Sequence, residues 1–175
     1  MRKEKNFKSN ALYLTRAAII AALYFVLTLV SGMLGLDGKA LIQVRLSEAL
    51  CVLPVITSSA IPGVTIGCLL YNLLFASPID AIFGTAATFI GVLATRYIPI
   101  FKRNIYLASI PTVVSNTLII PFVVAIAYMN GDLSAVPLLS LTVAIGEIIS
   151  CSVLGTLLLL SLKKNKNKIF GSFSR

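Results

Sequence analysis

Long apolar stretches separated by short charged clusters constrain this chain more than any other feature. Six hydrophobic runs follow one another with few charges inside them, and each approaches the roughly 20 residues that a helix needs to cross a bilayer. The chain has 175 residues, of which 58% are hydrophobic and 12% are charged, against roughly 25% charged residues in a soluble domain. We therefore predict an all-α integral membrane protein, a bundle of six transmembrane helices, forming a single membrane domain over residues 1–175.

The hydrophobic runs give approximate bounds for the six predicted spans. The second and third spans are short and nearly continuous. Pro54, Pro62 and Gly63 divide them, because proline removes a helix donor and restricts the residue before it. One long kinked helix is the alternative for these two spans, although about 35 residues is too long for a single crossing. The predicted spans are 12–34, 42–58, 60–76, 79–98, 105–129 and 137–162.

The basic residues support an even number of crossings. With six spans, thirteen basic residues fall on the side of the two chain ends, whereas only Lys39 and Arg45 fall on the opposite side. Such a bias marks the cytoplasmic side, so we expect a multi-pass protein of the plasma membrane with both termini in the cytoplasm. The net charge of +9 then reflects topology and does not indicate nucleic acid binding. The thirteen residues are Arg2, Lys3, Lys5, Lys8, Arg16, Arg96, Lys102, Arg103, Lys163, Lys164, Lys166, Lys168 and Arg175.

The N-terminal segment resembles the basic part of a signal peptide. The apolar stretch that follows, residues 12–34, is longer than the roughly 7–15 residues of a signal peptide's apolar region. More hydrophobic spans come after it. We therefore expect a retained first helix.

The residues that the sequence lacks exclude several kinds of chemistry. The chain has no histidine, so it has no Ser-His or Cys-His pair and no histidine metal site. Cys51, Cys68 and Cys151 lie inside apolar runs without metal-ligand spacing, which predicts buried cysteines and no bound metal. No G-x-x-x-x-G-K-[ST] stretch is present to bind ATP phosphates. We expect neither enzymatic activity nor a cofactor in this chain.

Ionisable groups inside membrane spans are costly and usually functional. Glu48 lies near the outer end of the second span, three residues after Arg45, so both face one side of a helix. Glu147 lies about ten residues into the sixth span, roughly 15 Å from its outer end, with no basic residue nearby in sequence. Asp80 falls on the outer side at a predicted turn. Structural roles, a local ion pair for Glu48 and a hydrogen bond between helices for Glu147, are the alternatives.

Two asparagines add weaker signals. Asn72 lies near the outer end of the third span beside Tyr71, and Asn116 lies between Pro111 and Pro121 in the fifth. Two prolines should bend that helix and free carbonyl groups toward a cavity. A hydrogen bond between helices explains either asparagine equally well. Because the polar groups of spans two, three and six gather in the outer half, we predict one pocket open to the outside.

Small residues on two spans indicate close helix contacts. On the fourth span they form a stripe that predicts internal packing, and on the first span they form two overlapping A-x-x-x-A pairs after Arg16. The first set is Gly84, Thr88, Gly91 and Thr95; the second is Ala17, Ala18, Ala21 and Ala22.

Two stretches, TRAAIIAALYFVLT at 15–28 and IQVRLSEALCVLP at 42–54, resemble the QueT family. The R-L-S-E-A-L sequence is the most specific part, and the likeness in length, spans and basic ends extends over nearly the whole chain. QueT proteins are S-components, the substrate-binding subunits of energy-coupling-factor (ECF) transporters. The resemblance implies an S-component-like bundle and uptake of a queuosine precursor, chiefly 7-aminomethyl-7-deazaguanine.

The resemblance also implies partners. S-components associate in the lipid bilayer with a membrane coupling subunit and two ATPase subunits, which use the ATP. The alanine motif that contacts the coupling subunit would be carried by the four alanines of the first span. The loop that closes over the ligand would run from about Gly35 to Gln43, with Asp37 and Gly38 inside it.

The chemistry of a 7-deazaguanine can be matched to these residues. A carboxylate accepts the ring N–H and the exocyclic amine together, and we predict Glu147 for this guanine-like edge. The aminomethyl group is a cation, for which we predict Glu48 or Asp80. The remaining candidates, donors for the carbonyl oxygen and a ring for stacking, are Arg45, Asn72, Asn116 and Tyr71.

Two other functions are compatible with this sequence. S-components for different vitamins share an architecture, and a fold does not determine a function. The two buried acids favour a donor-rich or cationic ligand and disfavour one that carries a carboxylate, such as biotin. A small proton-coupled exporter that uses Glu147 as its relay is the second alternative. In an exporter, substitutions in the alanine motif should not affect transport.

Overall fold

The computed structural model describes residues 2–36 and 43–164, with side chains from residue 9 onward. All regular elements in these ranges are helical and none is a strand, which confirms the predicted all-α class. Most of the predicted loop, with Asp37, Gly38 and Lys39, lies outside the described residues. Three of the basic residues assigned to the cytoplasmic side, Lys166, Lys168 and Arg175, lie outside them as well.

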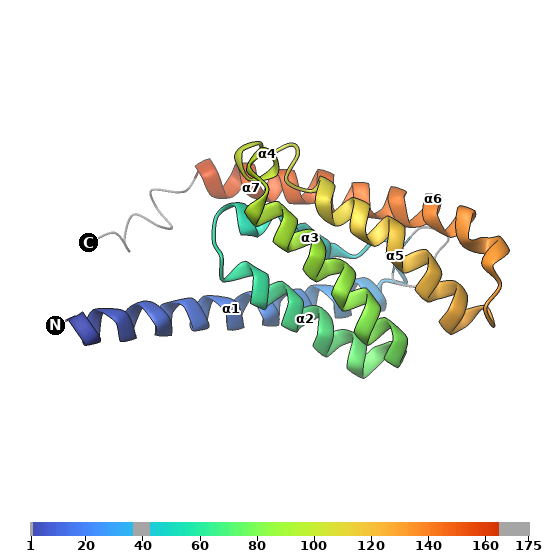
Figure 1. Cartoon of the computed structure of the whole chain (residues 1–175), viewed down its shortest axis with the longest axis horizontal. Helices are drawn as coiled ribbons and strands as arrows, with labels where there is room; N and C mark the ends of the chain where they lie inside the picture. Colours follow the sequence, from blue (N-terminus) through green and yellow to red (C-terminus); the bar gives the residue numbers. More distant parts are fainter. Residues whose placement is uncertain (1, 37–42, 165–175) are drawn as a thin grey trace.

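The chain runs back and forth along the long axis of the molecule (Figure 1). The helix α1 (Arg2–Met33) runs in one direction and η1 (Leu46–Val55) in the other. The next two passes are α2 (Ala60–Phe75) and the joined helices η2 (Asp80–Gly84) and α3 (Thr85–Tyr97). After the short α4 (Pro99–Arg103), α5 (Ile110–Tyr128) runs out, and η3 (Leu133–Ala135), α6 (Val136–Glu147), η4 (Ile148–Leu154) and α7 (Gly155–Lys164) return as one rod.

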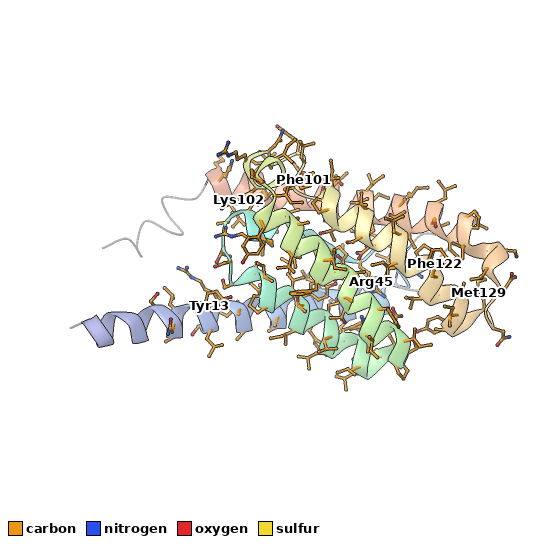
Figure 2. All side chains as sticks on the ribbon, viewed as in Figure 1. Tyr13, Arg45, Phe101, Lys102, Phe122 and Met129 are labelled. Carbon is orange, nitrogen blue, oxygen red and sulfur yellow. The ribbon has the colours of Figure 1, made fainter. Side chains whose placement is uncertain are left out.

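One end of the bundle holds the start of α1, the end of α7 and the whole of α4 (Figure 1). Lys102 on α4 lies at this end, and Met129 lies at the opposite end (Figure 2). At the opposite end Asp132 accepts hydrogen bonds from the backbone and hydroxyl groups of Ser134 at 2.9 and 2.6 Å. These bonds lower the pKa of this exposed carboxyl.

The protein is built for a membrane. The helices covering Ser9–Met33, Ile110–Tyr128 and Leu133–Lys164 are long and apolar enough to cross a bilayer, with mean hydropathies of 1.9, 2.0 and 2.1. Large apolar side chains point outward along the bundle, as at Leu74 and Leu118, which are 66% and 64% exposed. Many polar side chains are buried instead, an arrangement that suits lipid outside and polar contacts inside.

The second predicted span, 42–58, contains the ten-residue 3₁₀-helix η1. At about 2.0 Å per residue, η1 covers about 20 Å, whereas an α-helix of equal length covers about 15 Å. Hydrogen bonds fasten both ends: the Leu46 N–H donates to Ser31 Oγ at 2.9 Å, and Arg96 donates to the Pro54 carbonyl at 3.0 Å. Because η1 and α2 run in opposite directions (Figure 1), they are two elements and not one kinked helix.

Close packing joins α1 to α2. A methyl group at Gly63 would lie 2.8 Å from the Ala17 carbonyl oxygen, and one at Gly67 would lie 2.7 Å from that of Ala21. The two glycines therefore allow the backbones to approach, as small residues do in membrane bundles. Ala17 and Ala21 are only 5% and 8% exposed as a result.

Candidate functional site

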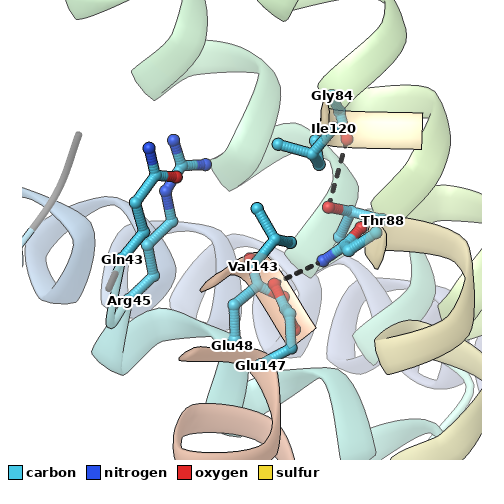
Figure 3. A pocket seen from close by; sticks show the side chains of 9 residues that line it. Gln43, Arg45, Glu48, Gly84, Thr88, Ile120, Val143 and Glu147 are labelled. Carbon is cyan, nitrogen blue, oxygen red and sulfur yellow. Dashed lines mark hydrogen bonds between the residues drawn. The ribbon is translucent and has the colours of Figure 1, made fainter. Parts of the chain in front are cut away.

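A pocket in the centre of the bundle brings together four of the predicted site residues: Arg45, Glu48, Asn116 and Glu147. Its volume is about 20 Å³, roughly that of one water molecule, so the walls must separate to admit a larger ligand. Figure 3 shows Gln43 and Arg45 on one side, Gly84, Thr88 and Ile120 on the other, and Glu48 and Glu147 side by side between them. The lining residues are Gln43, Arg45, Glu48, Gly84, Thr88, Asn116, Ile120, Val143 and Glu147.

The helices around the pocket depart from regular α-geometry. Glu48 lies in the first turn of the 3₁₀-helix η1, and Gly84 is the last residue of the π-helix η2. Glu147 ends α6 just before the π-helix η4. Asn116 lies in α5 between Pro111 at its start and Pro121 in its interior. Such segments often mark functional sites, because they change the direction of side chains within a continuous helix.

Glu48 is 2% exposed and is held by donors from its own chain. The Tyr24 hydroxyl donates to its Oε1, and the Cys51 thiol donates to its Oε2 at 3.0 Å. Beside this contact, the hydroxyl groups of Thr28 and Ser47 lie 2.8 Å apart. The polar side of α1 thus packs directly against the start of η1 and orients the carboxyl group of Glu48.

Glu147 and Asn116 form the second polar contact of the pocket. The Asn116 amide donates to Glu147 Oε1 at 2.8 Å. The other Glu147 oxygen, Oε2, and the Asn116 carbonyl oxygen, Oδ1, are buried and have no hydrogen-bond partner within the described ranges. Buried polar atoms normally have partners. Two acceptors on neighbouring side chains in one pocket are therefore suited to a ligand that presents donors.

The extended segment Gln43–Arg45 forms one wall of the pocket. The Val44 N–H donates to the Leu36 carbonyl at 2.9 Å, which ties this segment to the end of α1. The Gln43 carbonyl oxygen packs directly on Gly146 and fills the space that a side chain at residue 146 would need. This contact holds Arg45 in the wall of the pocket that also contains the two acids.

Asp80 and Asn72 lie next to the pocket without lining it. Asp80 begins the π-helix η2 and is 6% exposed, so the predicted turn at this residue is wrong. Its N–H donates to Ser77 Oγ at 3.1 Å, which lets the helix start earlier. The Asn72 amide donates to the Asp80 carbonyl at 3.2 Å, and Tyr128 approaches Asp80 Oδ2 at 3.4 Å. Both side chains lie against Gly84, which itself lines the pocket.

Tyr71, predicted to stack on a ligand, packs elsewhere. Its ring lies 6.3 Å from that of Phe25 and 5.3 Å from that of Phe75, measured between ring centroids. This aromatic cluster joins α1 to α2 and does not line the pocket. A tyrosine near the end of a span is equally suited to packing and to ligand stacking, and here it packs.

An apolar groove runs between α1 and α2 on the outer surface, with a volume of about 600 Å³. All four alanines of the first predicted span contribute to it. Ala17 and Ala21 form its floor against α2, whereas Ala18 and Ala22 are exposed. The groove lining consists of Tyr13, Leu14, Ala17, Ala18, Ala21, Ala22, Phe25, Val26, Pro62, Ile66, Leu70 and Leu74.

The sequence did not predict three residues that line the pocket, nor Tyr24, which contacts the pocket residue Glu48. Gln43, Ile120 and Val143 carry no distinctive local signal. Tyr24 does carry one, because Tyr24, Thr28 and Ser31 recur at helical spacing in an otherwise apolar helix. The two stretches at 15–28 and 42–54 meet through this polar stripe, in the contact between Tyr24 and Glu48.

Comparison with protein families gives one match: a model described as QueT transporter covers residues 14–164. The matched range contains the whole pocket lining and all four alanines of the groove. Comparisons with curated proteins and with solved structures gave no match.

Proposed function

Because the chain belongs to the QueT transporter family, we propose that it is the high-affinity substrate-binding S-component of an ECF-type importer for a queuosine precursor. The substrate that we propose is 7-aminomethyl-7-deazaguanine or a close relative. One observation carries this choice of ligand. Two buried acceptors without partners in the described chain, Glu147 Oε2 and Asn116 Oδ1, lie in a pocket that also contains a second carboxyl group.

The donors of a 7-deazaguanine suit these two acceptors. The base presents its ring N–H and its exocyclic amine side by side, and neighbouring acceptors can receive both. Glu147 Oε1 already accepts from Asn116 at 2.8 Å, so the carboxylate and the amide share the recognition of this edge. On the other side of the pocket, Arg45 supplies a donor for the carbonyl oxygen of the base.

The charges of the pocket also favour this ligand. Glu48 and Glu147, if ionised, exceed the single guanidinium of Arg45 by one negative charge. A monocation such as the aminomethyl base compensates this charge, whereas a ligand with a carboxylate adds to it. Charges within a low-dielectric interior require such compensation.

The groove between α1 and α2 is the proposed contact for the membrane coupling subunit. Ala18 and Ala22 expose a smooth strip on which a partner helix can approach closely. In this proposal two ATPase subunits supply the energy, the chain itself catalyses no reaction and needs no cofactor, and the basic end of the bundle faces the cytoplasm.

Thermal unfolding in detergent tests the ligand class. A ligand that binds only the folded protein adds about 2.7 kcal/mol of stability at one hundred times its Kd. We expect 7-aminomethyl-7-deazaguanine to raise the unfolding temperature, and riboflavin and biotin to leave it unchanged. Stabilisation by another vitamin but by no deazaguanine would instead indicate an S-component with a different substrate.

The unpartnered oxygen of Glu147 also suits the relay of a proton-coupled exporter. Uptake into proteoliposomes separates the two functions. An S-component requires the coupling subunit, the ATPases and an unobstructed groove, whereas an exporter works alone and tolerates Ala18→Leu.

A further inference from the structure

We propose that Asp80 and Asn72 form a polar subsite behind Gly84 that binds the ammonium group of the ligand and selects it over neutral analogues. This inference rests on the proposed function and names the part of the ligand that the subsite recognises. It also decides between Glu48 and Asp80, the two acids predicted for the ammonium group.

Gly84, which lines the pocket, is in direct contact with both of these side chains. A methyl group at Gly84 would lie 2.8 Å from Asp80 Oδ1 and 3.3 Å from the Asn72 amide nitrogen. It would also lie 3.6 Å from Ile120, which lines the pocket. The Asp80 carboxylate therefore packs against the face of Gly84 where a side chain would project, beside the pocket-lining Ile120.

The subsite has the chemistry that an ammonium group needs. Asp80 is 6% exposed and Asn72 is 1% exposed, so water competes little with a ligand there. The Asn72 carbonyl oxygen is buried without a partner in the described part of the chain. A carboxylate with a neighbouring amide oxygen offers a cation both charge compensation and a second acceptor.

The arrangement of the acids favours Asp80 over Glu48 for this role. Glu48 and Glu147 lie side by side, and Gly84 lies across the pocket from them (Figure 3). The guanine-like edge and the 7-substituent are at opposite ends of a deazaguanine. If Glu147 binds the edge, the ammonium group points toward Gly84.

Calorimetric titration of the purified full-length protein tests the subsite. The ligands are 7-aminomethyl-7-deazaguanine and its neutral 7-cyano analogue. The variants are Asp80→Asn and Gly84→Ala, with Asp132→Asn as the exposed control. We expect Asp80→Asn to weaken binding of the aminomethyl base at least about tenfold, as loss of a charged hydrogen bond does, and to change binding of the cyano base less than about twofold. Gly84→Ala should also reduce the preference for the aminomethyl base over the cyano base, whereas Asp132→Asn should leave this preference unchanged.

The outcomes separate the subsite from the proposed function. If Asp80→Asn weakens the binding of both bases equally, or of neither, the subsite is overturned. The proposed function still stands in that case, provided that the wild-type protein binds a deazaguanine. Absence of wild-type binding to either base overturns both. Asp80→Glu keeps the charge, so its preference for the aminomethyl base should exceed that of Asp80→Asn; the same preference in both variants contradicts the subsite even if both are less stable.

Discussion

Replacing Glu147 by glutamine keeps the shape of the side chain and changes what it offers to a ligand. In the native pocket Oε1 accepts from Asn116, and Oε2 and the Asn116 carbonyl oxygen are buried acceptors without a partner in the described chain, which we assign to the ligand. After the substitution, one of the two side chains must present an N–H group instead. If glutamine accepts from Asn116, its own amide nitrogen faces the ligand; if both amides turn over, the nitrogen of Asn116 does.

The expected loss of affinity follows from these contacts. Removing a hydrogen bond to a charged group costs about 1.5–3 kcal/mol, and leaving the opposing donor unpaired costs about 1–3 kcal/mol more. A total of about 2.5–6 kcal/mol corresponds to roughly 60- to 20,000-fold weaker binding. The Asn116 hydrogen bond within the protein survives in either orientation, so the unfolding temperature of the ligand-free protein should change little.

Competition binding against a labelled 7-aminomethyl-7-deazaguanine measures this loss over the required range. Asp132→Asn serves as the control, because it also converts an acid to its amide but lies at an exposed turn. A Glu147→Gln variant that is as stable as the native protein and binds within twofold of it would refute the assignment of Glu147 to the ligand.

Three further predictions concern the groove between α1 and α2, the packing of α2 on α1, and the carboxyl group of Glu48. Ala18→Leu should abolish ATP-driven uptake and leave ligand binding intact. Ala11 is exposed on the same helix but lies outside the groove, so Ala11→Leu should allow both uptake and binding. Loss of ligand binding in Ala18→Leu would contradict a role of Ala18 in contacting the coupling subunit alone. Gly67→Ala should destabilise the protein by about 1–3 kcal/mol, because its methyl group would lie 2.7 Å from a carbonyl oxygen of α1; an unchanged unfolding temperature would argue against this contact. Tyr24→Phe should weaken ligand binding about tenfold, because it removes a hydrogen-bond donor to the Glu48 carboxyl group. Tyr13 is exposed, so Tyr13→Phe should not change ligand affinity. Equal affinities of Tyr24→Phe and the native protein would show that this hydrogen bond does not orient Glu48 for ligand binding.

The sequence was sufficient to predict the all-α class and the gathering of Arg45, Glu48, Asn116 and Glu147 around one pocket. The physical reason is the cost of exposing polar groups to lipid, which directs them to the interior of the bundle. The predicted span 60–76 also lies close to α2, Ala60–Phe75, because prolines and a turn limit it on both sides.

Other features could not be predicted because they depend on contacts between helices. Hydrophobic runs do not reveal that η1 is a 3₁₀-helix or that η2 and η4 are π-helices, since these differ from α-helices in hydrogen bonding and not in composition. The alanines of the first span are similar in sequence, yet Gly63 and Gly67 of α2 cover only two of them. The burial of Asp80 likewise depends on the neighbouring helices.

The measurement that tests the central claim most directly is isothermal calorimetry of the purified protein with 7-aminomethyl-7-deazaguanine. We predict one binding site with a Kd below about 1 µM, a binding free energy more favourable than about −8 kcal/mol, and weaker binding of guanine. No detectable binding of the aminomethyl base or of any other 7-deazaguanine to folded protein would contradict the proposed substrate.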